Sequence, residues 1–343
     1  MDNIKKIRVG ISIGDTNGIG IEIILKTFKD KRILELCTPI IYGSSKILTT
    51  HKNLLNIAIP FQRIQNAEAA IPGKINVITI WNQDIPVEIG KPTKQGGQAA
   101  FLSLEVAVKD LKEKKIDVLV TAPINKNTIQ SEQFNFPGHT EYLEQKLSGE
   151  ALMILMTGSL KVALLTGHIP VTAISSTITP ELIYKKVNIL YRTLIEDFSI
   201  TKPKIALLSI NPHAGDKGII GDEDEKIMIP SIAELQKEGK LVYGPYAADS
   251  FFGSNTYKAF DAVLAAYHDQ GLTAFKTLAF GKGVNYTAGL DGIRTSPEHG
   301  TAFDIAGKGI ADNTSFKEAI FTAISIYNTR TQKRALKENA LKK

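Results

Sequence analysis

Short apolar runs alternate with longer amphipathic segments along almost the whole chain. The short runs are rich in Val, Ile and Leu, and several are almost continuously apolar rather than alternating with polar residues. This pattern predicts strands that are buried on both faces of a largely parallel sheet. The predicted strands are Ile7–Ile13, Pro39–Tyr42, Ile75–Trp81, Asp117–Thr121, Lys161–Thr166, Lys204–Ile210 and Ala262–Tyr267.

The amphipathic segments between these runs predict helices. Thr179 is a suitable N-cap, since Pro180 at the first helical position and Glu181 in the first turn follow it. Strands that alternate with helices indicate an α/β fold with right-handed crossover connections. The predicted helices are Ile19–Phe28, Gly97–Lys114, Pro180–Asp197, Glu223–Lys237 and Ser315–Tyr327.

The length of 343 residues is enough for one large core or two ordinary domains. No internal repeat, low-complexity segment or Gly/Ser linker divides the chain. We expect a two-domain α/β architecture with largely parallel sheets and an interdomain cleft. The expected division puts residues 1–130 with 286–343 in the first domain and residues 131–285 in the second.

Composition places the chain among ordinary folded proteins. Hydrophobic residues make up 43% and charged residues 22%, and the mean hydropathy is −0.03. These values exclude a disordered chain, a collagen and a disulfide-stapled mini-protein. The single cysteine, Cys37, cannot form an internal disulfide or a cysteine-rich zinc site. A reducing, cytoplasmic compartment is therefore expected.

The formal charge is 41 − 35 = +6, a mild excess for this length. Much of it lies at the C-terminus, where a solvated helix end explains it better than a nucleic-acid patch. No apolar run approaches the roughly 20 residues that span a bilayer, and the short charged stretch Met1–Arg8 does not read as a signal peptide. We expect neither a nucleic-acid nor a membrane partner. The C-terminal basic residues are Arg330, Lys333, Arg334, Lys337, Lys342 and Lys343.

Three of the six histidines, His168, His213 and His268, lie at or just past the ends of predicted core strands. In open α/β sheets, ligands bind at the carboxyl ends of the strands. The spacings of 45 and 55 residues equal about one or two β-α units, so the three imidazoles can converge. Three neutral histidines around a divalent ion leave one coordination position open for a substrate oxygen. Three structurally satisfied loop histidines are the alternative.

Two acidic residues lie near these histidines in the sequence. Asp249 and Asp269 can act as a base, as further ligands, or as partners that orient an imidazole. For each of them, a role in a cap or turn is an equally good explanation.

Two turns are candidate anion sites. Pro137–Glu141 is a tight turn ahead of a helix, where backbone N–H groups and the Thr140 hydroxyl can receive an anion, with His139 beside them. Simple capping by Thr140 explains the same residues. The loop Gly14–Gly20 follows the first strand, but it lacks the G-x-G-x-x-G spacing and a convincing acid about 20 residues on. It is therefore a weak nucleotide site.

The segment between Lys276 and Arg294 sets polar residues among apolar ones. A buried cationic side chain usually needs an anionic partner, and a phosphate or carboxylate substrate would serve. The planar guanidinium of Arg294 suits bidentate contact with such groups. Asn285 lies in the same segment. A surface lysine and a structural ion pair are the alternatives.

Taken together, these segments resemble the 4-hydroxythreonine-4-phosphate dehydrogenase family, the NAD-dependent enzymes of pyridoxal 5′-phosphate biosynthesis. The resemblance runs from Ile11 to about Phe321. The most specific segments are Gly138–Glu141, Asn211–Gly215, Tyr267–Leu272, Gly281–Asn285 and Ile293–Ser296.

The resemblance implies a fold like that of isocitrate and isopropylmalate dehydrogenases, in which a loop rather than a Rossmann fingerprint holds NAD. The matching stretch here is Glu298–Asp312. It implies that His299, Gly300, Thr301, Ala302 and Asp304 lie at or near the dinucleotide, which would be NAD, with NADP as the alternative.

The resemblance also implies roles for the other candidates. His168, His213 and His268 would be ligands of a divalent metal, which could be Zn²⁺, Mg²⁺, Mn²⁺ or Co²⁺, and three histidines favour zinc or another transition metal. The implied assembly is a homodimer with the active site at the subunit interface, metal ligands and substrate contacts coming from different chains. The implied substrate contacts are His139, Thr140, Lys276, Asn285 and Arg294.

The sequence departs from the family pattern at a few positions. Thr16 and Asn17 stand where Pro and Ala or Ser are common, Asp291 where Pro is usual, and Glu298 where Asp is frequent. None of these changes removes an expected metal ligand or substrate contact.

The expected reaction is metal-assisted oxidation of 4-phosphooxy-L-threonine by NAD to a 3-keto acid, which loses CO₂ to give 3-amino-2-oxopropyl phosphate. Asp249, Asp269 and Lys276 are the candidate catalytic residues, with Asp249 as general base or metal support. The motifs do not exclude a related dehydrogenase of erythronate or threonate 4-phosphate. A metal-dependent hydrolase and a non-enzymatic phosphate- or nucleotide-binding module are the rival classes.

Overall fold

The computed structural model describes residues 6–81 and 84–340. The chain divides into two compact units. Unit 1 takes its residues from Met1–Gly149 and Leu290–Tyr327, and unit 2 from Glu150–Gly289 and Asn328–Lys343. The division at 130/131 and 285/286 that we expect from the sequence stays a prediction.

Unit 1 contains a parallel sheet with the strand order β3-β4-β2-β1-β5-β12. Every residue of β2 and β5 is buried, as the continuous apolar runs predict. The strands are β1 (Ile7–Ser12), β2 (Cys37–Gly43), β3 (Gln62–Ile64), β4 (Asn76–Thr79), β5 (Val118–Thr121) and β12 (Arg294–Pro297).

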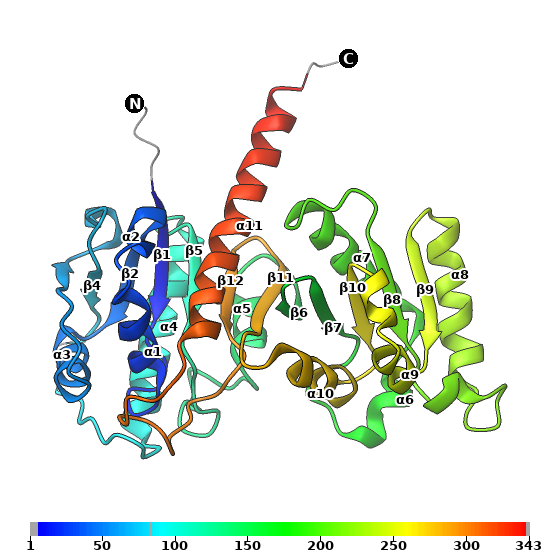
Figure 1. Cartoon of the computed structure of the whole chain (residues 1–343), viewed down its shortest axis with the longest axis horizontal. Helices are drawn as coiled ribbons and strands as arrows, with labels where there is room; N and C mark the ends of the chain where they lie inside the picture. Colours follow the sequence, from blue (N-terminus) through cyan, green and yellow to red (C-terminus); the bar gives the residue numbers. More distant parts are fainter. Residues whose placement is uncertain (1–5, 82–83, 341–343) are drawn as a thin grey trace. The chain divides into compact units, whose positions relative to one another are not determined.

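Most helices of unit 1 connect these strands, and two others follow β5 and β12 (Figure 1). The longest connecting helix is α4 (Lys94–Lys112), whose N-cap Thr93 accepts a hydrogen bond from the Gly96 N–H. The others are α1 (Gly20–Phe28), α2 (Ile33–Leu36), α3 (Ser45–Leu54), the 3₁₀ turn η1 (Ala67–Ala69), α5 (His139–Lys146) and the first part of α11 (Thr314–Glu338).

Unit 2 contains strands in the order β11-β6-β7-β10-β8-β9. The pairs β7/β10, β10/β8 and β8/β9 are parallel, and β6/β7 is antiparallel. The strands are β6 (Gly149–Thr157), β7 (Leu160–Leu164), β8 (Lys204–Leu208), β9 (Leu241–Tyr246), β10 (Ala262–Ala265) and β11 (Val284–Leu290).

Helix α7 (Pro180–Glu196) of unit 2 begins as the sequence predicts, because the Thr179 hydroxyl accepts from the Leu182 N–H and Pro180 opens the helix. The predicted helix 223–237 is a π-helical turn, η4 (Asp224–Met228), that continues as α8 (Ile229–Lys237). The remaining elements are η2 (Val171–Ala173), α6 (Ile174–Thr177), η3 (Pro212–Gly215), α9 (Ala248–Gly253), η5 (Thr256–Ala259) and α10 (His268–Ala279).

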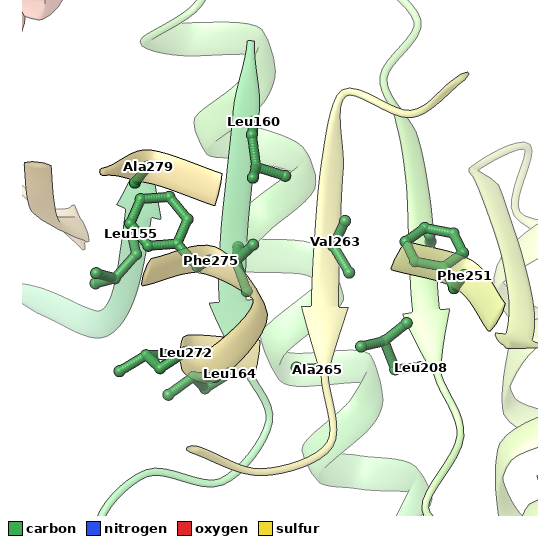
Figure 2. Close-up of a cluster of buried hydrophobic side chains, with 12 residues drawn as sticks. Leu155, Leu160, Leu164, Leu208, Phe251, Val263, Ala265, Leu272, Phe275 and Ala279 are labelled. Carbon is green, nitrogen blue, oxygen red and sulfur yellow. The ribbon is translucent and has the colours of Figure 1, made fainter. Parts of the chain in front are cut away.

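A buried apolar cluster fixes the position of α10 in unit 2 (Figure 2). Leu272, Phe275 and Ala279, spaced at three and four residues, form one face of the helix and belong to the same cluster as Leu164 of β7 and Val263 of β10. Figure 2 shows this helical turn against the two strands. Because α10 starts directly after β10, this packing fixes His268 just beyond the carboxyl end of that strand.

The α/β class with a largely parallel sheet is therefore confirmed. The seven predicted strands and five predicted helices all lie on observed elements. The sequence pattern did not predict the helices α2, α3, α6, α9 and α10 or the strands β3, β6, β9, β11 and β12. Helix α11 continues past the predicted end at Tyr327 to Glu338.

The basic C-terminal segment is not entirely a solvated helix end. Arg330 of α11 binds Asp197, at 2.5 Å between Nε and Oδ1, and donates to the Tyr286 hydroxyl at 2.9 Å. The Tyr286 hydroxyl donates to Asp197 at 2.6 Å, and both of these residues are buried. The Lys333 ammonium donates to the carbonyl of Ile195. Arg334 and Lys337 are exposed as expected, and Lys342 and Lys343 lie outside the described residues.

Two predictions from composition can be followed in the structure. Cys37 is a buried free thiol whose Sγ lies 3.6 Å from the Ile33 carbonyl oxygen, and burial raises its pKa to about 12. Among the described residues, no helix combines the length and the apolar character that crossing a bilayer requires.

Candidate functional site

Two of the three candidate metal ligands lie next to each other in unit 2. The ring centroids of His168 and His268 are 5.3 Å apart. His168 follows β7 and is exposed, and His268 opens α10 and is half-buried. The Nδ1 of His268 lies 2.6 Å from a carboxylate oxygen of Asp269. A proton held between these two atoms leaves Nε2 as the ring atom that can bind a metal.

His213 lies in η3, where its backbone has φ +52° and the next residue, Ala214, has φ +53°. Two consecutive non-glycine residues in the left-handed region are uncommon, and such strain is concentrated at functional sites. Within residues 6–81 and 84–340, no three His, Cys, Asp or Glu side chains are grouped as a metal site. The structure thus brings His168 and His268 together but does not group His213 with them, and the three-histidine site stays a prediction.

The three candidate catalytic residues lie on two helices of unit 2. Asp249 is in the first turn of α9 and is exposed. Asp269 is in the first turn of α10, and Lys276 is exposed in the last turn of the same helix. Asp269 therefore has an observed partner in His268, which favours an orienting role over that of a base.

Asn285 lies on β11 and is half-buried. Its side-chain oxygen is inaccessible to solvent and accepts no hydrogen bond from the described residues. A buried amide oxygen without a donor has a free-energy cost that a bound donor would remove. Asn285 is therefore a suitable place for a polar ligand group.

Arg294 is a buried cation in unit 1. It opens β12, which pairs in parallel with β5, and its side chain is 2% exposed. Its Nε and Nη2 donate to the Thr121 hydroxyl oxygen at 3.0 and 2.6 Å. Burial lowers the pKa of the guanidinium to about 9, and the nearby Glu141 carboxylate opposes this shift. A buried guanidinium on one edge of a site is suited to binding an anion.

His139 lies close to this guanidinium. Burial holds the pKa of His139 well below its ordinary value, and the positive charges of Arg294 and Lys126 lower it further. The imidazole is therefore neutral near pH 7, and its Nε2 is covered and has no hydrogen-bond partner among the described residues. A neutral ring carries one N–H donor, which can serve a bound oxygen.

The turn before α5 contradicts the interpretation of Thr140 as a helix N-cap. The N-cap is Gly138, with extended backbone, and His139 and Thr140 are the first helical residues. Thr140 as N-cap is wrong, because a cap must precede the helix while Thr140 has entered it. Thr140 is half-buried in the first turn, where helix N–H groups favour an anion.

The expected cofactor segment also lies in unit 1, as an irregular stretch between β12 and α11. His299 is half-buried, and its Nε2 is covered and without a partner among the described residues. Thr301 is buried, Ala302 has φ +42°, and Gly300 and Asp304 are exposed. The Thr301 carbonyl accepts a hydrogen bond of 3.0 Å from the Ile19 N–H.

The first loop, Gly14–Gly20, is completely buried. The N–H of Asn17 and the hydroxyl of Thr128 donate to the Asp15 carboxylate, at 3.0 and 3.2 Å. Burial raises the pKa of Asp15, and these hydrogen bonds oppose the shift. The loop is thus occupied by contacts with its own chain, in keeping with its poor match to a dinucleotide fingerprint.

The candidate site residues thus lie in two groups, one in each unit. In unit 1, Arg294, His139 and Glu141 lie within electrostatic range of one another, and in unit 2, His168, His268 and Asp269 form a contiguous group. Sequence reasoning missed Thr121 as the partner of Arg294. The only signal for it was its position at the end of a predicted strand.

Comparison with known proteins gives a family match. Residues 35–323 match the family described as "Pyridoxal phosphate biosynthetic protein PdxA". A relative from Bacteroides thetaiotaomicron named 4-hydroxythreonine-4-phosphate dehydrogenase is 52% identical over 341 residues, which cover 99% of this chain and 94% of that protein.

Two further relatives bear on fold and specificity. The crystal structure of 4-hydroxythreonine-4-phosphate dehydrogenase from Klebsiella pneumoniae has a TM-score of 0.80 and 32% identity, and the match covers 95% of this chain and 99% of that one. A protein from Oceanobacillus iheyensis, provisionally named D-threonate 4-phosphate dehydrogenase, is 39% identical, with 95% of this chain and 99% of that protein covered.

Proposed function

Since the chain belongs to the pyridoxal phosphate biosynthetic PdxA family, we propose that it is an NAD-dependent 4-hydroxythreonine-4-phosphate dehydrogenase. The substrate, 4-phosphooxy-L-threonine, carries a phosphate at one end and an α-amino acid at the other. The observation that carries the assignment of residues is the buried Arg294, which is held by Thr121 beside a neutral His139.

The phosphate or the carboxylate of the substrate binds at Arg294. An anion there compensates for the burial of the guanidinium and receives donors from His139 and from the first turn of α5. Thr140 contributes its hydroxyl, and Lys276 and Asn285 bind the remaining polar groups. The nearby Glu141 carboxylate limits how much negative charge the site holds.

A divalent metal fits His168 and His268. The two rings are adjacent, and Asp269 directs the Nε2 of His268 toward a ligand. We assign His213 as the third ligand, and nitrogen ligands favour zinc or another transition metal over magnesium. When bound, the metal supplies Lewis-acid polarisation of substrate oxygens.

NAD fits the segment His299–Asp304, where the covered Nε2 of His299 lacks a partner among the described residues. The cofactor supplies the hydride acceptor. Gly300, Thr301 and Ala302 would hold the dinucleotide through backbone groups, and Asp304 would hold it through its carboxylate. NADP is the alternative cofactor.

The proposed reaction has two steps, an oxidation and a decarboxylation. Oxidation removes a hydride and the hydroxyl proton from the secondary alcohol. Bound NAD would accept the hydride, and Asp249 is our candidate for the base that takes the proton. The resulting 3-keto acid loses CO₂, and the electron pair left behind takes up a proton to give 3-amino-2-oxopropyl phosphate. Arg294, His139 and Thr140 hold the substrate in place throughout, and this orientation is their contribution to the rate.

We propose a cytoplasmic homodimer whose active sites contain residues of both chains. The distance between the two ends of α10 supports this assembly. His268 and Lys276 are eight residues apart on one helix, so their Cα atoms are separated by about 12 Å along its axis. A four-carbon substrate does not readily span both ends of one helix. We therefore assign the metal ligands and Lys276 to different chains within each site.

Mixing two inactive variants tests this dimer. His268→Ala and Lys276→Ala, mixed after partial unfolding and refolding, form mixed dimers in which one of the two sites is intact. About a quarter of the wild-type activity then returns at equal mixing. No recovery, with mixed dimers present by mass measurement, rules out sites shared between chains.

The substrate panel tests the activity itself. NADH formation is measured with 4-phosphooxy-L-threonine, D-threonate 4-phosphate and D-erythronate 4-phosphate, each with Zn²⁺, Mg²⁺, Mn²⁺ or Co²⁺. We expect the highest kcat/KM with the amino-acid phosphate. The similarity to the Oceanobacillus protein favours threonate 4-phosphate as the second candidate. NADH from none of the three contradicts the proposed function.

A further inference from the structure

Three segments of unit 1 pack together around the expected cofactor residues. They are the first loop (14–20), the segment 88–93 that leads into α4, and the segment 299–307. We call them together the cofactor platform. Asn17 of the first loop, which is completely buried, lies at the point where the second segment joins the first.

The Asn17 side chain holds the segment 88–93 by both ends of its amide. Its oxygen accepts from the Glu88 N–H at 2.8 Å, and its nitrogen donates to the Lys91 carbonyl at 3.0 Å and to the Thr93 hydroxyl at 2.9 Å. The Asn17 carbonyl also accepts from the Gly90 N–H at 2.9 Å. No residue with a shorter or apolar side chain can make this set of bonds.

The same two segments form the surface against which the segment 299–307 packs. A Cβ on Gly18 would lie 2.8 Å from the Thr301 carbonyl oxygen, and one on Gly90 would lie 3.0 Å from the Phe303 carbonyl oxygen. Gly90 also has φ +79°, which disfavours any other residue. A Cβ on Gly307 would lie 2.6 Å from the Ile89 side chain. Asn17 therefore affects the positions of Thr301 and Phe303 indirectly, through the segments that pack against them.

Two covered polar atoms at this platform have no partner among the described residues. They are the Nε2 of His299 and the hydroxyl of Thr16, which directly precedes Asn17. The Thr16 carbonyl is occupied, since it lies 2.8 Å from the Nε2 of the buried His51. Buried polar groups without partners indicate a place where a polar ligand completes the hydrogen bonding.

We propose that Asn17 is a positioning residue for the dinucleotide, which sets the affinity for NAD by holding the segments 88–93 and 299–307 in the bound arrangement. This inference rests on the proposed function, because it takes His299–Asp304 as the cofactor segment.

The test measures NADH binding by fluorescence titration of the free enzyme, together with thermal unfolding. Asn17→Ala removes three side-chain hydrogen bonds that hold the segment 88–93, and we expect it to weaken NADH binding about tenfold. We expect the Kd for NADH and the KM for NAD to rise together, with the KM for the phosphate substrate within about twofold of wild type. Asn17→Ser, a smaller disturbance, is expected to show the same split.

Asn76→Ala is the matched control. Asn76 is also completely buried in unit 1, and its amide also ties down a loop, through the Pro39, Ile71 and Lys74 carbonyls and the Ile71 N–H. It should lower thermal stability as much as Asn17→Ala does while leaving NADH affinity unchanged.

The outcomes separate the positioning role from a structural one. Equal losses of stability in both variants with unchanged NADH affinity in Asn17→Ala and Asn17→Ser overturn the inference and leave the proposed function standing. Equal rises in the KM for NAD and for the phosphate substrate also overturn it. A wild-type enzyme that binds no NADH overturns the cofactor assignment and this inference together.

Discussion

Arg294 and Thr121 are 173 positions apart in the sequence, yet one hydroxyl oxygen accepts two hydrogen bonds from the guanidinium, at 3.0 and 2.6 Å. The hydroxyl belongs to the last residue of β5, and the guanidinium to the first residue of the neighbouring β12. Parallel pairing of these two strands brings the groups together. The Thr121 hydroxyl thereby fixes the plane in which Arg294 presents its donors.

Because Arg294 is the anion site that we propose, we expect Thr121→Val to weaken substrate binding. Hydrogen bonds to charged groups contribute about 1.5–3 kcal/mol, so we expect KM for the phosphate substrate to rise about ten- to a hundredfold. Thr121→Ser keeps the hydroxyl and should retain near-normal KM. Steady-state kinetics at saturating NAD measures both.

A neighbouring threonine provides the control for that experiment. Thr295 is equally buried, and its hydroxyl donates to the Ala319 carbonyl, away from Arg294. Thr295→Val should cost similar stability and leave KM unchanged. If the two valine variants raise KM equally, Thr121 has no special relation to substrate.

His139 makes stability depend on pH. Its pKa in the folded protein lies below the ordinary 6.5, because burial and the charges of Arg294 and Lys126 disfavour the imidazolium. Between the two pKa values the unfolded chain binds more protons than the folded protein. The contribution of His139 to the free energy of unfolding is therefore fully present above pH 6.5 and is lost as the pH drops below it. One such group contributes at most about 1.4 kcal/mol per pH unit.

We expect His139→Gln to reduce this slope. Urea unfolding between pH 5 and 9 should show a shallower loss of free energy below pH 6.5 in the variant, and parallel curves for both proteins above pH 7.5. Identical slopes below pH 6.5 would show that His139 titrates normally in the folded protein.

Removal of one expected metal ligand should abolish turnover. His213→Ala leaves two histidine ligands, and we expect no measurable NADH formation and a divalent-metal Kd raised by at least about tenfold. The circular dichroism spectrum and Tm of the metal-free protein should match wild type, because His213 is exposed. Calorimetric titration with Zn²⁺ measures the affinity directly. Wild-type activity of this variant after treatment with a chelator contradicts the three-histidine site.

The ion pair of Arg330 and Asp197 should carry much of the stability of the C-terminal part of α11. Arg330→Met leaves the Asp197 carboxylate buried with the Tyr286 hydroxyl as its remaining side-chain donor among the described residues, and we expect the free energy of unfolding to fall by about 3 kcal/mol. Arg334→Met, on an exposed position of the same helix, should change stability by less than about 0.5 kcal/mol. Equal midpoints of urea unfolding for the two variants would contradict the assignment.

Most of the apolar strands were predictable from the sequence, although β6 was missed, and the polar strand β12 was not predictable. β5 reads Val-Leu-Val-Thr and the predicted part of β2 reads Pro-Ile-Ile-Tyr, whereas β12 reads Arg-Thr-Ser-Pro and is just as buried. The polar groups of β12 are satisfied across the fold, by Thr121 for Arg294 and by Ala319 for Thr295. Local pattern does not encode such distant partners.

Helix α10 was missed for a different reason. The polar residues His268, Asp269 and Gln270 interrupt the apolar pattern directly after β10, although Leu272, Phe275 and Ala279 have helical spacing. The candidate histidines, by contrast, could be found from their positions after strands. The hydrogen bonds of the Asn17 side chain could not be predicted from the sequence, because its partners lie 71 to 76 residues further along the chain.

The buried position of the lone thiol has a practical consequence. Cys37 is the single cysteine of the sequence, it is fully covered, and its raised pKa leaves almost no thiolate at neutral pH. A cysteine introduced on an exposed residue such as Phe280 or Ile310 would therefore be the one thiol that a maleimide dye reacts with. Cys37 therefore does not have to be replaced before a fluorescent label is attached at one chosen site to follow cofactor and metal binding.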